Sequence, residues 1–152
     1  MGKAELLHVP LFNMFFKRMN IPVDRRSITS SHKAFNRAKL DIEKGISIAI
    51  YPEATIPECA PEVGPFKNGA FKLAIEQQIP IVPVTYLDNW KIFPDRKGER
   101  YLCRPGFSRI ILHSPIETTG MKDEDVSTLR QQVHTIIKQT MITHGSICKS
   151  NT

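Results

Sequence analysis

Residues 46–55 read ISIAIYPEAT, and this stretch decides the expected fold. Its first six residues form a short apolar run rich in β-branched side chains, which predicts a buried strand. A proline-rich loop follows directly over residues 52–65, with Pro52, Pro57, Pro61, Gly64 and Pro65. Because α/β proteins place binding sites in the loops at strand ends, this loop is the first candidate site.

Helical segments flank the predicted strand on both sides. The sequence before it predicts a helix that is capped by Ser30 or Ser31, runs to about Lys44 and ends with Gly45 in the C′ position. After the loop, an asparagine can cap a shorter helix over residues 68–78.

Two further apolar runs predict strands. Residues 79–86 read IPIVPVTY, in which Pro83 lacks the amide that a ladder needs and therefore indicates an edge or a bulge. Residues 107–113 read FSRIILH and predict a third strand. The polar, basic stretch 90–104 between them is expected to form a hairpin or a loop.

Apolar helices are expected near both ends of the chain. Residues 4–19 predict a very apolar helical segment that is interrupted near Pro10. A final amphipathic helix is expected from about Lys122 to His144, with an apolar stripe of Val126, Leu129, Val133, Ile136 and Ile137. Strands that alternate with helices indicate an α/β fold, and residues 145–152 are expected to be a frayed tail.

Composition bounds the class of protein. The 152 residues are 41% hydrophobic and 24% charged, which is typical of one globular domain with its own core. The net charge of +6 favours anionic partners such as phosphorylated metabolites, lipid surfaces or nucleic acid. Three cysteines without a CxxC pair argue against a disulfide scaffold and indicate a reducing compartment. No apolar run approaches the roughly 18 residues of a membrane-spanning helix, and the N-terminal residues are not typical of a signal peptide.

Positive charge is densest over residues 17–44, which hold eight basic and three acidic side chains. The basic residues from Lys33 to Lys44 are interpreted as a solvated helix face. Arg25 and Arg26 follow the sequence IPVD, and arginine is suited to clamp a phosphate with two hydrogen bonds. This arginine pair is therefore a candidate phosphate-binding site.

Four segments in a fixed order carry a resemblance. They read IPVDRRS at 21–27, IYPEAT at 50–55, GPFKNGAFK at 64–72 and IPIVPV at 79–84. This order resembles the lysophospholipid acyltransferase family, whose members move a fatty acyl group from a thioester carrier onto lysophosphatidate. The resemblance implies a central mixed sheet flanked by helices and identifies residues 1–144 as a partial acyltransferase domain.

The resemblance also implies which residues bind substrate. Arg25, or Arg26 as the alternative, matches the arginine that grips the phosphate of the acyl acceptor. Glu53 and Thr55 match a second motif of the family, for which substrate binding is expected. Pro83 matches a Val-Pro-Val step that lines the acyl side of the site.

Two positions depart from the second motif. Ala54 replaces a glycine and so adds a Cβ where a backbone approaches phosphate, and Ile56 replaces an arginine. Lys67 lies a short way along the chain and is a candidate substitute for the lost cation.

The histidine of the family's catalytic His-x4-Asp pair acts as a general base on the acceptor hydroxyl, and this pair is absent from the sequence. The residues five positions after the five histidines are Asn13, Arg37, Thr118, Gln139 and Lys149. We therefore expect a family domain whose first part lies outside this chain, and no catalysis by the chain alone. His8 and His134 are interpreted as packing or surface residues, and Cys59 as unreactive.

The expected function is phospholipid biosynthesis at the cytoplasmic face of a membrane, to which the protein attaches peripherally. The expected substrates are lysophosphatidate and an acyl-CoA or acyl-carrier protein, with no cofactor and no metal. A non-catalytic module that binds phospholipid or an anionic membrane is the alternative. A nucleic-acid partner is disfavoured because the sequence has no helix-turn-helix, zinc-finger or RNA-binding signature.

Overall fold

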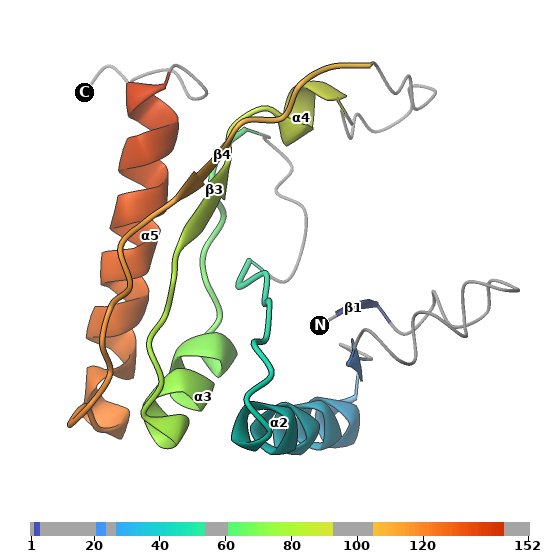
Figure 1. Cartoon of the computed structure of the whole chain (residues 1–152), viewed down its shortest axis with the longest axis vertical. Coiled ribbons are helices and arrows are strands. Elements are labelled where there is room, and N and C mark those ends of the chain that lie inside the picture. The colour runs from blue at the N-terminus through green and yellow to red at the C-terminus, as the bar shows by residue number, and fades with distance from the viewer. Residues whose placement is uncertain (1, 4–20, 24–26, 54–60, 93–104, 145–152) are drawn as a thin grey trace, which may run out of the picture. The chain divides into compact units, whose positions relative to one another are not determined.

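The computed structural model describes residues 2–3, 21–23, 27–53, 61–92 and 105–144 of the chain. The chain divides into two compact units, residues 1–51 and residues 52–152. Figure 1 shows the elements of both units. The helix expected over 4–19 and the hairpin or loop expected over 90–104 lie wholly or mostly outside the described residues.

The first unit contains a short parallel strand pair and one long helix. Strand β1 (Gly2–Lys3) pairs with β2 (Pro22–Val23), with Gly2 opposite Pro22. Helix α2 spans Ile28–Glu43. Its N-cap is Ser27, and not Ser30 or Ser31 as predicted, because the extended backbone of Ser27 lets its Oγ accept a hydrogen bond from the Ser30 amide at 3.2 Å.

Helix α2 is terminated by the predicted glycine, Gly45, in the C′ position. Gly45 has a φ of +78°, a conformation that glycine adopts without strain. The Gly45 amide donates to the Ile42 carbonyl at 2.8 Å, and the Ile46 amide donates to the Asp41 carbonyl at 3.0 Å. These two bonds form a Schellman motif and satisfy carbonyls at the end of the helix.

The buried strand predicted over residues 46–51 is not observed. The structure assigns residues 46–50 to no strand, and the side chains of Ile46 and Tyr51 are 51% and 66% exposed. β-Branched residues favour a strand only where a sheet supplies a neighbouring ladder and a packing surface. The two-residue β1–β2 pair does not extend to this segment.

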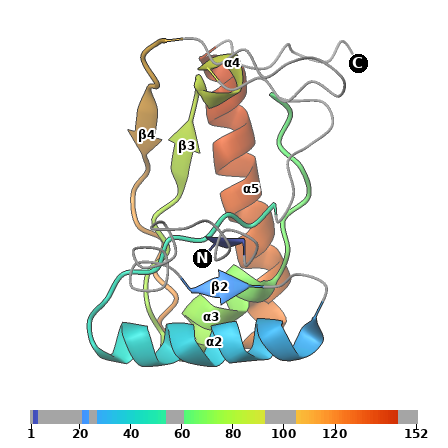
Figure 2. The same cartoon turned by 90° about the vertical axis from the view of Figure 1, so that its right-hand side faces the viewer.

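The second unit packs two helices and an antiparallel strand pair. In chain order its elements are α3 (Gly69–Gln77), β3 (Val84–Tyr86), α4 (Asn89–Ile92), β4 (Ile110–Leu112), the 3-10 turn η2 (Asp123–Asp125) and α5 (Val126–Thr143). Figures 1 and 2 show α5 running alongside β3 and β4, with α3 near the start of α5. The elements are those of a mixed α/β fold, although among the described residues the predicted central sheet is reduced to two separate two-stranded sheets.

Pro83 interrupts the antiparallel pair, as its position predicted. Val84 lies opposite Leu112 at the end of the β3–β4 ladder, and an isolated bridge joins Ile81 to Ile116. Between these pairings two residues on one strand face three on the other, which is a bulge. The carbonyl of Pro83 still accepts a hydrogen bond from the His113 amide at 3.0 Å.

The core of the second unit lies between α3 and α5. Its buried members are Phe66, Phe71, Ile75, Val126, Leu129 and Val133. The apolar stripe predicted for the final helix therefore faces the core, with Leu129 only 1% exposed. Among the helices that the structure describes, none is long and apolar enough to cross a membrane.

Candidate functional site

Glu53 is joined by a hydrogen bond to the segment on the far side of the proline-rich loop. Its Oε2 accepts from the Gly64 amide at 3.1 Å, and the side chain is half-buried. Burial raises the pKa of the Glu53 carboxyl above its usual value, while the Gly64 hydrogen bond and the electrostatic attraction of His134 act in the opposite direction. The Glu53 carboxylate thus helps to hold the ends of the loop together.

A second hydrogen bond closes the same loop. The Lys67 amide donates to the Pro52 carbonyl at 2.9 Å. Together with the Glu53–Gly64 contact, it sets residues 52–53 beside residues 64–67. The backbone of Lys67 is therefore fixed next to that of Glu53, and the Lys67 side chain is exposed.

Phe66 anchors this segment in the core. Its side chain is buried, and its ring stacks on that of Phe71 with centroids 6.3 Å apart. The His134 ring meets the Phe66 ring edge-on, with centroids 4.9 Å apart. The packing role expected for His134 is thus the one observed, and α5 supplies a residue that touches the candidate site.

Asn68, at the start of α3, uses its side chain for a contact with α5 and not for capping. No side-chain capping bond is formed, although Asn68 occupies the predicted cap position. Instead, its Oδ1 accepts a hydrogen bond from Arg130 Nη1 at 2.8 Å. No local pattern in the sequence pointed to Arg130, because Asn68 and Arg130 are 62 positions apart.

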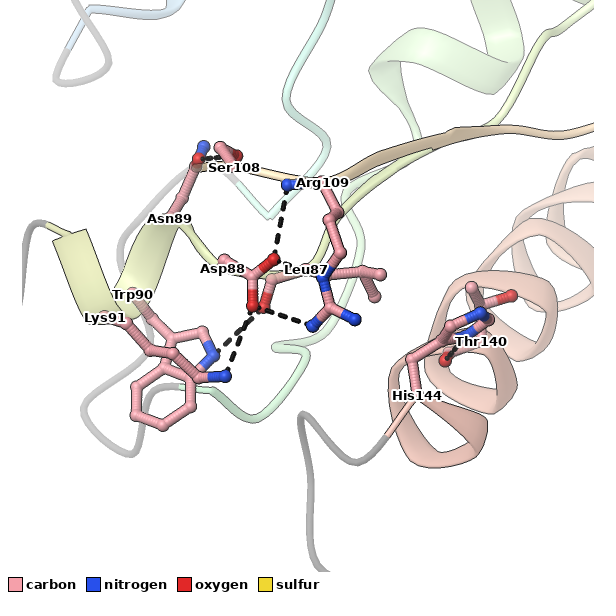
Figure 3. A network of polar contacts seen from close by, with 9 residues as sticks. All are labelled: Leu87, Asp88, Asn89, Trp90, Lys91, Ser108, Arg109, Thr140 and His144. Carbon is pink, nitrogen blue, oxygen red and sulfur yellow. Dashed lines mark hydrogen bonds and ion pairs between the residues drawn. The ribbon is translucent and has the colours of Figure 1, made fainter. Parts of the chain in front are cut away.

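Asp88 organises a second polar cluster at the end of β3, shown in Figure 3. Its carboxylate accepts from Arg109 Nε at 2.7 Å, from Arg109 Nη2 at 2.9 Å and from Lys91 Nζ at 3.2 Å. Hydrogen bonding from Arg109 holds the pKa of the Asp88 carboxyl well below its usual range, despite the opposing effect of burial. Because Arg109 and Lys91 share this one carboxylate, the cluster is a brace between the start of β4 and α4.

The sequence-predicted site residues divide into two sets. The described residues bring Glu53 and Lys67 together, and they place Pro83 at the bulge of the strand pair. The others, Arg25, Arg26, Ala54 and Thr55, lie outside the described residues. That Arg25, Arg26, Ala54 and Thr55 bind substrate therefore stays a prediction. No group of His, Cys, Asp or Glu that could hold a metal ion occurs among the residues that the structure describes.

Comparison with known proteins identifies the family. A model of the acyltransferase family matches residues 1–87, which is more than half of the chain. The chain belongs to the acyltransferase family. The resemblance found in the sequence motifs is confirmed, and residues 88–152, which include α5, lie beyond the region that the family model matches.

Individual relatives carry a more specific name. The chloroplastic 1-acyl-sn-glycerol-3-phosphate acyltransferase BAT2 of Brassica napus is 30% identical over 116 residues, covering 76% of this chain and 33% of the relative. The human 1-acyl-sn-glycerol-3-phosphate acyltransferase beta is 29% identical over 118 residues, covering 78% and 41%. The chain thus spans about a third to two fifths of the length of these two relatives.

A solved structure shares the fold. The crystal structure of the 1-acyl-sn-glycerophosphate acyltransferase PlsC from Thermotoga maritima matches with a TM-score of 0.72 at 22% identity. The match covers 98% of this chain and 57% of that one. The predicted α/β acyltransferase fold is therefore confirmed.

Proposed function

We propose that this chain contributes the acyl-acceptor site of a lysophosphatidate acyltransferase in phospholipid biosynthesis. The reaction transfers a fatty acyl group from acyl-CoA or acyl-carrier protein to the free hydroxyl of lysophosphatidate and gives phosphatidate. Family membership and the named relatives support this proposal. The observation that carries it is the hydrogen-bonded loop base, in which Glu53 accepts from the Gly64 amide and Pro52 accepts from the Lys67 amide.

The charges at the loop base suit different roles. Lys67 is an exposed cation, suited to a phosphate headgroup, and stands in for the arginine that Ile56 replaces. Glu53 would repel a phosphate, and its carboxylate already accepts from Gly64. We therefore assign Glu53 to holding the loop in position and Lys67 to binding the headgroup; phosphate binding by Arg25 or Arg26 is what the resemblance implies.

Acyl transfer requires a general base that this sequence does not contain in the family's form. The acceptor hydroxyl must lose its proton as its oxygen attacks the thioester carbonyl, and the thiol then leaves. None of the five histidines has an aspartate five positions later. We therefore propose that the His-x4-Asp pair is supplied from outside these 152 residues. We also propose that the enzyme works at the cytoplasmic face of a membrane.

The test is acyl transfer from radiolabelled oleoyl-CoA to lysophosphatidate, with and without an added N-terminal segment. The 152-residue chain is expected to be inactive, and fusion to the His-x4-Asp segment of a relative is expected to give activity. Turnover by the unfused chain at the rate of a complete relative would show that the base has been misplaced. A fusion protein that folds and stays inactive would contradict the proposed site.

The second candidate function is a non-catalytic module for anionic lipid. It is favoured by the net charge of +6 and by the missing histidine–aspartate pair. Such a module binds vesicles of phosphatidylglycerol as tightly as vesicles that contain lysophosphatidate. A lysophosphatidate acyltransferase site prefers the phosphate monoester.

A further inference from the structure

Helix α5 packs against the segment that carries Lys67. Leu129 and Val133, on the inner face of α5, share a buried core with Phe66. This packing fixes the helix relative to residues 64–68. The family model matches residues 1–87, so α5 lies outside it. Any residue that α5 contributes to the site therefore does not belong to the family motifs.

Arg130 differs from the other arginines that the structure describes. Arg37 pairs with Asp41 at 3.0 Å, and Arg109 pairs with Asp88 at 2.7 Å. Arg130 instead donates to the neutral amide of Asn68, and none of the described carboxylates forms an ion pair with it. Among the described residues its positive charge is therefore not compensated, and its hydrogen bond to Asn68 lies in an exposed position.

The position of Arg130 places this charge beside the candidate headgroup site. Asn68, its hydrogen-bond partner, directly follows Lys67, whose backbone is tied to Pro52 at the loop base. The hydrogen bond to Asn68 occupies Nη1, and a guanidinium has five N–H donors. The remaining donors can bind a phosphate in the two-pronged manner that a lysine cannot reproduce.

We propose that Arg130 is a phosphate-binding residue of the acyl-acceptor site, where it acts with Lys67 in place of the arginine lost at Ile56. The ligand is a phosphate monoester, either the headgroup of lysophosphatidate or a soluble monoester such as glycerol 3-phosphate. This inference rests on the proposed function. It extends the site to a helix outside the matched family region.

The test is titration calorimetry of the full chain with a short-chain, monomeric lysophosphatidate. Arg130→Gln is expected to weaken binding about tenfold or more, because a charge-assisted phosphate contact is lost. Arg130→Lys is expected to restore part of the affinity. Lys138→Gln, which removes an exposed charge elsewhere on α5, is the matched control and is expected to change affinity less than twofold.

Asn68→Ala separates binding from a structural role. It removes the observed partner of Arg130 without removing the guanidinium, so affinity is expected to fall clearly less than in Arg130→Gln. A loss in Asn68→Ala as large as that in Arg130→Gln would overturn the inference and make Arg130 a brace. Equal affinities of Arg130→Gln and Lys138→Gln would also overturn it.

Comparing the two ligands shows whether the phosphate belongs to a lipid or to a soluble monoester. It also shows whether a negative result rejects the proposed function or only the role of Arg130. Binding of glycerol 3-phosphate as tight as that of lysophosphatidate, with the same dependence on Arg130, supports a soluble monoester. Much tighter lysophosphatidate binding supports the lipid headgroup. If the unaltered chain binds neither ligand, both the proposed function and this inference are wrong, whereas binding that is insensitive to Arg130 rejects this inference alone.

Discussion

Replacing Phe66 by alanine is expected to destabilise the second unit strongly. The Phe66 side chain is 6% exposed, stacks on Phe71 and meets His134 edge-on. Truncation of a buried phenylalanine costs about 3–5 kcal/mol, because apolar burial is lost and a cavity remains. Since small domains are stable by about 5–15 kcal/mol, this change removes a large part of the total.

Phe66→Leu separates the ring contacts from the apolar volume. It keeps much of the volume but loses two aromatic contacts, each of which contributes about 0.5–1.5 kcal/mol. We therefore expect Phe66→Leu to cost about 1–3 kcal/mol. Phe107→Leu, at a position 97% exposed, is the control and is expected to cost less than about 0.5 kcal/mol.

Urea unfolding followed by the fluorescence of Trp90 measures these costs. Trp90 is the only tryptophan of the chain and lies in α4, so its signal reports on the second unit. A free energy of unfolding for Phe66→Ala within about 1 kcal/mol of the unaltered protein would refute the assigned core. It would also remove the anchor that places Lys67.

Three further predictions concern charge and backbone conformation. Because burial raises the pKa of Glu53, the folded state binds the proton more tightly than the unfolded state. The free energy of unfolding of the unaltered protein, compared with that of Glu53→Gln, should therefore fall as pH rises from about 4.5 through the raised pKa. Parallel pH profiles of the two proteins in urea unfolding would contradict this. Because Arg109 lowers the pKa of Asp88, Asp88→Asn should be less stable than the unaltered protein at neutral pH. Thermal melts should show this difference in stability shrinking as pH falls below about 3.8. A difference that stays constant with pH would argue against the ion pair. Gly45→Ala should lower the free energy of unfolding, followed by circular dichroism, by about 1 kcal/mol, because the φ of +78° at this position is strained for alanine. Gly69→Ala has open space around the added Cβ and should be neutral or stabilising. Equal effects of the two changes would count against Gly45 as the C′ residue of α2.

Local signals in the sequence predicted the elements that depend on nearby residues. Gly45 ends α2 because a left-handed residue is needed one position after the helix cap. Pro83 causes a bulge because it has no amide to donate. The stripe that includes Leu129 and Val133 predicted the buried face of α5 from helical spacing alone.

Features that depend on distant residues were not predictable in the same way. The segment 46–51 has the composition of a strand but is not assigned to one, because pairing depends on a neighbouring ladder and not on composition. The choice of Ser27 over Ser30 depends on one extended backbone conformation. Within the candidate site, a family motif predicted Glu53 and its place along the chain suggested Lys67, whereas Arg130 is brought to Asn68 only by the packing of α5.

The central claim is that the loop base and Lys67 belong to a site for a phosphate monoester lipid. The most direct measurement compares the affinities of the full chain for lysophosphatidate and for lysophosphatidylcholine of the same acyl chain, with Lys67→Gln beside the unaltered protein. We predict saturable binding of lysophosphatidate, about tenfold tighter than that of the choline ester, and a marked loss in Lys67→Gln. Equal affinities for the two lipids, or a Lys67→Gln variant that binds lysophosphatidate as the unaltered chain does, would contradict the account.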